Sequence, residues 1–106
     1  MFEEKIVLCV SNSYEKKYYL NDDFQSLPQQ VKDELKIMCV LYTEEVGGIL
    51  SLEYEEDGSL QFMVQAKEGD LLFDEIGSAL KIKQIREEKK ELLEALETYY
   101  KVFFLQ

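Results

Sequence analysis

The sequence contains no histidine and only one arginine, Arg86. Histidine is the usual general base near neutral pH, the partner of serine and cysteine nucleophiles, and the commonest zinc ligand. Arginine is the side chain that grips a phosphate or carboxylate group with two hydrogen bonds. No Gly-rich phosphate loop is present either. We therefore expect a non-enzymatic protein that uses no cofactor.

A single proline and the lack of Pro-rich or Ser-rich stretches leave no linker to divide the chain. Its 106 residues match the length of one compact domain. Hydrophobic residues make up 46% of the chain, a share typical of globular proteins. These features predict a single domain over residues 1–106.

The two cysteines, Cys9 and Cys39, lie in apolar runs and lack the close spacing of a redox or zinc pair. This favours buried thiols in a reducing compartment. Glu3 and Glu4 stand where a secretory leader carries positive charge, and the apolar run Ile6–Val10 is too short to cross a membrane. We expect a cytoplasmic protein with no membrane partner.

Two pairs of apolar, β-rich runs predict two hairpins. The first joins residues 6–10 to residues 16–20 across a polar turn, and the second joins residues 50–54 to residues 60–64. In the second hairpin a two-residue turn would place the two apolar sets on opposite faces. A three-residue loop over residues 56–58 avoids this by pairing Tyr54 with Leu60, Leu52 with Phe62 and Leu50 with Val64, and it puts Gly58 in a left-handed position.

A helix is expected between the hairpins. Ser26 followed by Gln29, with Pro28 in the first turn, predicts a helix that starts near Leu27, and Gly47-Gly48 ends it. Apolar residues occupy every face of its second half, so that half is expected to be buried nearly all round.

The last third of the chain predicts two helices with a break between them. Asp70 is the expected cap of a first helix, which carries Leu72, Phe73, Ile76 and Leu80 on its buried side. A second apolar stripe lies in a different phase, so we expect a break at residues 80–83 and a long helix over residues 83–104. The result is an α+β fold with order β-β-α-β-β-α-α: two layers, with a four-stranded antiparallel sheet and helices on one face. The spatial strand order stays open.

One group of carboxylates offers an alternative chemistry. Asp70 and Asp74, four positions apart on the expected helix, together with Glu75, could hold a divalent cation. Acidic residues in a first helical turn also stabilise the helix dipole, and we prefer this explanation.

Negative charge is concentrated in one segment. Residues 44–75 contain ten acidic residues against Lys67 alone, and so carry −9 of the formal charge of −10. Nucleic acid is accordingly a poor partner. Four acidic residues belong to the second hairpin: Glu53, Glu55, Glu56 and Asp57. They either keep the strand edges soluble or form a docking face for a protein with a basic surface.

Aromatic residues at the end of the chain form a second candidate surface. Tyr99 and Phe103 are expected to pack on the sheet. Tyr100 and Phe104 point about 100° away and are the predicted contacts with a partner, most simply a second copy of the chain.

The chain resembles a family of short, acidic, uncharacterised bacterial proteins. The resemblance covers about residues 5–104 and is carried by four motifs: Tyr14-Glu15-Lys16-Lys17-Tyr18-Tyr19, Glu45-Val46-Gly47-Gly48-Ile49, Asp74-Glu75-Ile76-Gly77-Ser78 and Tyr99-Tyr100. It implies a cytosolic bacterial protein and no particular activity.

Our leading hypothesis is thus a homodimeric protein-protein interaction or regulatory module with an acidic docking face. The alternatives are a divalent-metal-binding protein or metal-dependent enzyme that uses Asp70, Asp74 and Glu75, and an immunity or inhibitor protein whose acidic hairpin mimics nucleic acid.

Overall fold

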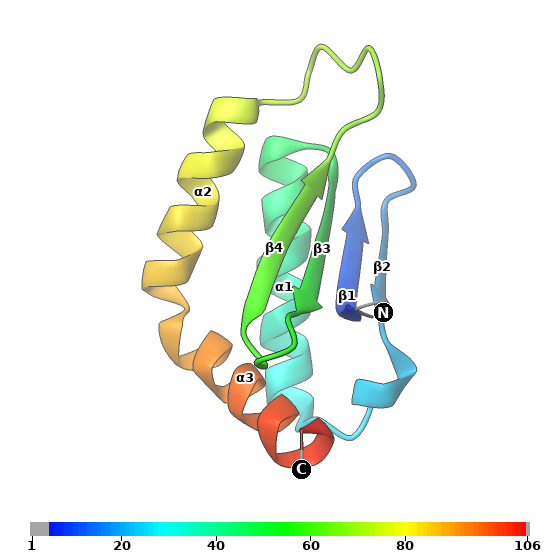
Figure 1. The fold of residues 1–106 in the computed structure, drawn as a ribbon. Coiled ribbons are helices and arrows are strands. Elements are labelled where there is room, and N and C mark those ends of the chain that lie inside the picture. Colours follow the sequence, from blue (N-terminus) through cyan, green and yellow to red (C-terminus); the bar gives the residue numbers. More distant parts are fainter. Residues whose placement is uncertain (1–4, 106) are drawn as a thin grey trace.

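The computed structural model describes residues 5–105, which form a four-stranded antiparallel sheet and three α-helices (Figure 1). The strands are β1 (Ile6–Asn12), β2 (Lys17–Leu20), β3 (Ile49–Tyr54) and β4 (Leu60–Gln65). The helices are α1 (Gln29–Val46), α2 (Glu75–Glu88) and α3 (Lys90–Phe104), and a short 3-10 turn, η1 (Asp22–Phe24), precedes α1. The predicted α+β class and element order are confirmed. The strand order, which the sequence left open, is β2-β1-β3-β4.

The register predicted for the second hairpin is confirmed. Three cross-strand pairs align as expected: Tyr54 with Leu60, Leu52 with Phe62 and Leu50 with Val64. The loop closes with hydrogen bonds from the Gly58 N–H to the Glu55 carbonyl and from the Glu55 N–H to the Ser59 carbonyl. Gly58 has a φ of 88°, the left-handed conformation that this loop requires.

The central strand β1 carries a bulge that the alternation did not predict. The pairing with β3 shifts between Val7 and Cys9, so Leu8 is an extra residue, and both Leu8 and Cys9 are buried. The Sγ atoms of Cys9 and Cys39 lie 3.8 Å apart, and both thiols are free, as expected. The contact with Cys9, followed by burial, raises the pKa of Cys39.

Helix α1 starts later than predicted. Pro28 precedes its first residue, Gln29, and no side chain caps the helix. The expected cap, Ser26, instead shares a hydrogen bond of 2.5 Å with the Tyr99 hydroxyl. The fixed φ of proline suits a helix start without the help of a capping side chain.

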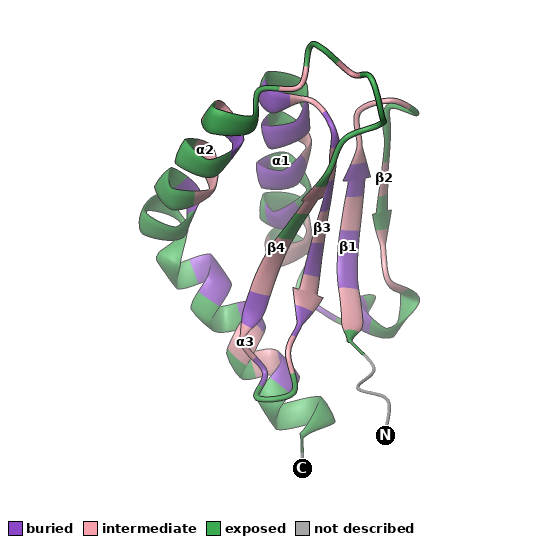
Figure 2. Cartoon of the chain, turned by 45° about the horizontal axis from the view of Figure 1, so that its top comes forward, coloured by how far each residue is buried: buried purple, intermediate pink, exposed green. Residues whose placement is uncertain are grey.

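Helix α1 packs against β1, β3 and the other two helices, and leaves its remaining side in solvent. Its buried residues include Leu35, Cys39 and Tyr42. On its other side Ile37 and Leu41 are 58% and 55% exposed. The expectation that the second half is buried all round is therefore wrong, because α1 forms an outer layer of the molecule with nothing from residues 5–105 covering its outer side (Figure 2).

The break between the last two helices falls later than predicted, at Lys89 rather than at residues 80–83. Helix α2 also starts later, because its cap is Asp74, whose side chain accepts a hydrogen bond from the Gly77 N–H. Asp70 lies outside the helix, so the prediction that it caps the helix is wrong. The short first helix and long second helix of the prediction are in fact two helices of similar length.

Of the aromatic residues of α3, Tyr99 packs against the core as predicted, but Tyr100 and Phe103 have exchanged the expected positions. Tyr100 is only 6% exposed and its ring stacks on Tyr54 at 4.1 Å between centroids. Phe103 is 67% exposed. The buried stripe of α3 runs through Leu93, Leu96 and Tyr100, because this side of the helix faces Tyr54 and Phe24. Within residues 5–105, no helix combines the length and apolar character needed to cross a bilayer.

Candidate functional site

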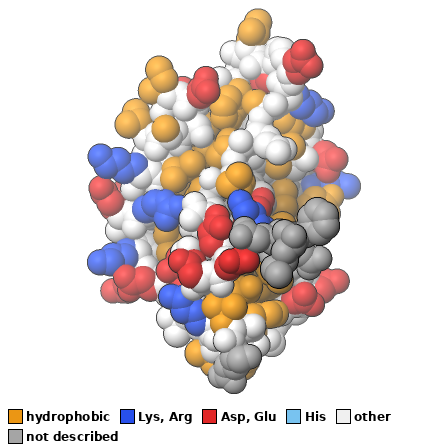
Figure 3. Space-filling model, viewed as in Figure 1, with side chains coloured by type: hydrophobic (Ala, Val, Ile, Leu, Met, Phe, Trp, Pro, Cys, Tyr) orange, Lys and Arg blue, Asp and Glu red, His pale blue; other side chains and the backbone are white. Residues whose placement is uncertain are grey.

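Four large aliphatic side chains at the start of α2 and in the loop before it project into solvent. Leu71 is 95% exposed, Leu72 92%, Ile76 77% and Leu80 64%. We call these four residues the apolar α2 face. Figure 3 shows hydrophobic side chains projecting on the α2 side of the molecule and from the loop above the sheet. Apolar surface of this kind usually marks a contact site.

Contacts on the opposite side of α2 fix this orientation. The Tyr42 and Ser78 hydroxyls share a buried hydrogen bond between α1 and α2. An ion pair of 3.0 Å joins Lys81 Nζ to Glu45 Oε2, also between α1 and α2. Because these contacts turn one side of α2 toward α1, the apolar α2 face points away from the core. This corrects the sequence-based assignment of Leu72, Ile76 and Leu80 to a buried side.

The end of α3 exposes a smaller apolar area. Phe104 is 37% exposed, and its ring stacks on Tyr100 and Phe24 at 5.1 and 5.0 Å between centroids. It therefore covers the core and retains some accessible surface. Tyr100 lies beneath it, so Tyr100 cannot meet a partner without disruption of the core.

The acidic hairpin, β3–β4 with its four acidic residues, is partly balanced by nearby cations. Lys5 Nζ lies 3.6 Å from Glu55 Oε1, and the Ser51 hydroxyl donates to Glu53 at 3.1 Å. Glu53 and Glu55 are half-buried, whereas Glu56 and Asp57 are exposed at the tip. Acidic and basic side chains alternate over the lower part of this face in Figure 3.

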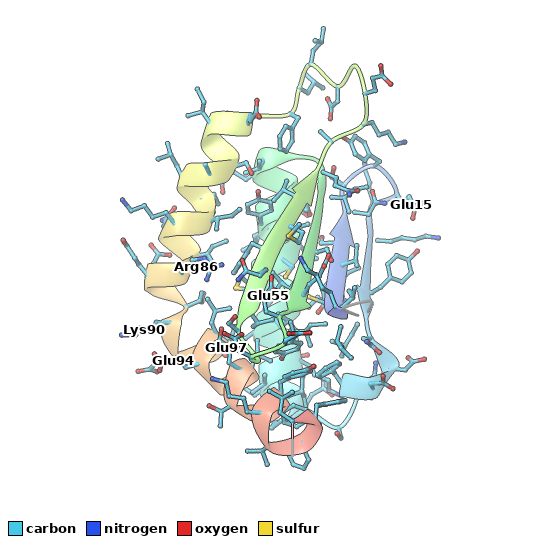
Figure 4. All side chains as sticks on the ribbon, viewed as in Figure 1. Glu15, Glu55, Arg86, Lys90, Glu94 and Glu97 are labelled. Atoms are coloured by element: carbon cyan, nitrogen blue, oxygen red, sulfur yellow. The ribbon has the colours of Figure 1, made fainter. Side chains whose placement is uncertain are left out.

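The tip of the acidic hairpin also packs against α3. A Cβ added to Gly58 would lie 2.8 Å from Lys101 Cγ, so the Lys101 side chain covers the turn. Hydrogen bonds from Ser59, and then the Lys101 charge, lower the pKa of Asp57. Glu97 accepts a hydrogen bond of 2.7 Å from the Leu60 N–H, and Figure 4 shows Glu97 beside this end of the sheet. The hairpin is thus less free to dock a partner than its sequence indicates.

The three carboxylates considered for a metal do not share a helix face. Asp70 accepts hydrogen bonds from the Tyr14 hydroxyl and the Leu72 N–H, and Asp74 is occupied as the cap of α2. Glu75 is the first residue of the helix. Over residues 5–105 no group of three or more His, Cys, Asp or Glu side chains is placed to hold a metal ion.

Tyr14 ties the loop of residues 66–74 to the β1–β2 hairpin. Its hydroxyl donates to Asp70 Oδ2 at 2.5 Å and accepts from the Lys67 N–H at 2.9 Å. The Lys67 ammonium also lies 4.7 Å from the centre of the Tyr14 ring. Tyr14 and Asp70 also line a groove of about 720 Å³ between the hairpin, α1 and the loop.

Sequence reasoning missed both the groove and the apolar α2 face. The groove joins residues that are far apart in the chain: Tyr14 and Asp70 are 56 positions apart. The apolar α2 face was visible as a stripe, but a stripe does not say whether it faces the core or a partner. The exposed turn residues Leu71 and Leu72, which precede the true cap, were the available signal.

Comparison with known proteins identifies the family. No curated protein and no solved structure matches the chain. Residues 5–106 match the model of a family described as "Family of unknown function (DUF6145)". The chain therefore belongs to this uncharacterised family.

Proposed function

We propose that this protein acts by binding a second copy of itself through the apolar α2 face, and that it is a non-enzymatic interaction module. One observation carries the proposal: the four side chains of that face are 64–95% exposed while α2 is held firmly on its other side. Burying a large aliphatic side chain stabilises a complex by about 1.5–3 kcal/mol. Four such side chains can offset a substantial part of the entropy lost on association.

The charge of α2 supports a second copy as the partner. Residues 75–88 contain three basic and three acidic residues, so the helix is neutral in a chain of formal charge −10. Two copies can therefore approach along α2 without the repulsion that their acidic segments would cause. If two α2 helices pack antiparallel about a point between Ile76 and Leu80, Ile76 of one copy contacts Leu80 of the other. This reciprocal contact is what a two-fold interface requires.

The acidic hairpin has a secondary part in this proposal. Glu56 and Asp57 remain exposed and could steer a basic protein toward the dimer. The contacts with Lys5 and Lys101 weaken the case for a nucleic-acid mimic, which needs an uncompensated row of negative charges. The separation of Asp70 from α2 likewise weakens the case for a metal-dependent enzyme.

Sedimentation equilibrium tests the proposal with two matched double variants. Ile76→Glu with Leu80→Glu places charges in the proposed interface and should weaken dimerisation by at least about 100-fold. Ile37→Glu with Leu41→Glu makes the same change on exposed positions of α1 and should leave dimerisation unchanged. A wild-type chain that stays monomeric up to about 1 mM, or equal effects of the two variants, contradicts the proposal.

A further inference from the structure

The groove between the β1–β2 hairpin and α1 has the size of a small-molecule site. Its volume of about 720 Å³ lies within the range of about 300–1,000 Å³ that is usual for such sites. Its lining residues come from the β1–β2 hairpin, from α1 and from the loops that precede β3 and α2, elements that Figure 1 labels. Of the residues considered above for metal binding or for dimerisation, only Asp70 and Leu72 line this groove.

Three lysines from two elements line the groove, although the chain as a whole is strongly acidic. Lys16 and Lys17 come from the hairpin and Lys36 comes from α1, and all three are exposed. Ion pairs among residues 5–105 involve other lysines, as in the pair of Lys81 with Glu45. The three ammonium groups therefore remain available to a ligand.

The two acidic residues of the groove, Asp70 and Glu44, cancel only part of this charge. The oxygens of Asp70 already accept hydrogen bonds from the Tyr14 hydroxyl and the Leu72 N–H. Three positive charges against two negative ones, in a chain of formal charge −10, make the groove a local positive site.

The remaining lining suits the body of an organic molecule. Tyr18 and Val40 supply apolar surface, and Ser11 and Thr43 share a hydrogen bond of 2.8 Å at the buried end. The Tyr18 hydroxyl is buried and has no hydrogen-bond partner among residues 5–105. Aromatic side chains such as Tyr18 offer flat surface on which a ring can stack.

We propose that this groove binds a small organic phosphate, with the phosphate on Lys16, Lys17 and Lys36 and a ring-sized body against Tyr18 and Val40. A phosphate monoester carries a charge of about −1.5 to −2 at neutral pH, and lysine binds it as a point charge. The only arginine, Arg86, is elsewhere, against Phe62. Recognition thus depends on charge and shape, without groups that would hydrolyse the ligand, and weakens as salt rises.

Amide NMR titration of the full chain at constant ionic strength tests this proposal with three probes: adenosine monophosphate, adenosine and inorganic phosphate. Adenosine monophosphate should shift the amide signals of the groove residues in a saturable way. Adenosine should bind at least about tenfold more weakly, because it lacks the charge. Inorganic phosphate should shift mainly the residues around the three lysines.

Two double variants with equal loss of charge complete the test. Lys16→Gln with Lys36→Gln should weaken binding of adenosine monophosphate by at least about tenfold. Lys89→Gln with Lys90→Gln, at the exposed junction of α2 and α3, should leave it within about twofold. All four side chains are exposed, so both variants should fold.

Three results would overturn the proposal. The first is that neither phosphate-bearing probe moves the groove amides. The second is that adenosine binds as tightly as its monophosphate, and the third is that the two double variants bind equally. Sedimentation of the Lys16 and Lys36 variant should match the wild type, so this test and that of the proposed function fail independently.

Discussion

Tyr14 shows how a single side chain joins two distant parts of this fold. Its hydroxyl donates to Asp70 and accepts from the Lys67 N–H, which fixes the loop before α2 against the β1–β2 hairpin. The hydrogen bond from Tyr14, followed by that from the Leu72 N–H, lowers the pKa of Asp70. No sequence pattern predicts this contact, because the pairing depends on where the loop and the hairpin meet in space.

Tyr14→Phe should raise the pKa of Asp70 toward its ordinary value of 3.8, because it removes the hydroxyl and keeps the ring. A carboxyl group whose pKa is lower in the folded state stabilises the fold at pH values above its ordinary pKa. This stabilisation is lost as the pH falls through the pKa of the folded state. In the wild type the hydrogen bond between Tyr14 and Asp70 should therefore weaken only below about pH 4. Carboxyl NMR titration measures the change, and Asp57, held by Ser59, is the control that should not move. An unshifted Asp70 would show that Tyr14 does not tie the loop.

Tyr100 and Phe103 test the revised packing of α3. Tyr100→Ala removes a buried ring stacked on Tyr54 and should lower the free energy of unfolding by about 3–5 kcal/mol. Phe103→Ala removes a ring that is 67% exposed and should change it by less than about 1 kcal/mol. Urea denaturation compares the two. A larger loss of stability for Phe103→Ala than for Tyr100→Ala would contradict the packing of α3 and favour the one expected from the sequence.

At the scale of elements, strand pairing was the most predictable feature. The alternation in β3 and β4 fixed their register, because a slip of one residue turns every apolar side chain outward. Helix boundaries were less predictable. Asp70 and Asp74 both resemble caps, but Asp70 lies before the helix, where it accepts hydrogen bonds from the Tyr14 hydroxyl and the Leu72 N–H. The later start and the break at Lys89 made two helices of similar length, and contacts with α1 and the sheet decided which side of each helix is buried.

Gly48 and Gly69 test how tightly α1, β4 and the loop before α2 are joined. Both have a positive φ, of 75° and 81°. A Cβ on Gly48 would lie 2.7 Å from the Gln65 carbonyl oxygen and 2.9 Å from the Phe73 ring, whereas one on Gly69 would meet nothing within 4 Å.

Gly69→Ala should therefore lower the free energy of unfolding by about 1–2 kcal/mol, through the strain of a left-handed alanine alone. Gly48→Ala should lower it by at least about 1 kcal/mol more. Chemical denaturation of both variants measures the difference. Equal losses of stability would mean that Gly48 does not lie so close to Gln65 and Phe73.

For the whole molecule, charge and apolar surface are separated in a way that composition alone could not reveal. The acidic excess lies between residues 44 and 75, α2 is neutral, and three lysines gather in the groove. The sequence predicted the acidic segment and the element order. It could not predict the groove or the exposed side of α2, because both depend on how the helices are turned once the sheet is formed.

The central claim is that the apolar α2 face binds a second copy of the chain. The most direct measurement is an intermolecular NOE experiment on a mixture of isotopically labelled and unlabelled protein. We expect contacts between the methyl groups of Ile76 and Leu80 in different copies. Intermolecular contacts confined to other methyl groups, such as those of Ile37 and Leu41, or no intermolecular contacts at all, would contradict it.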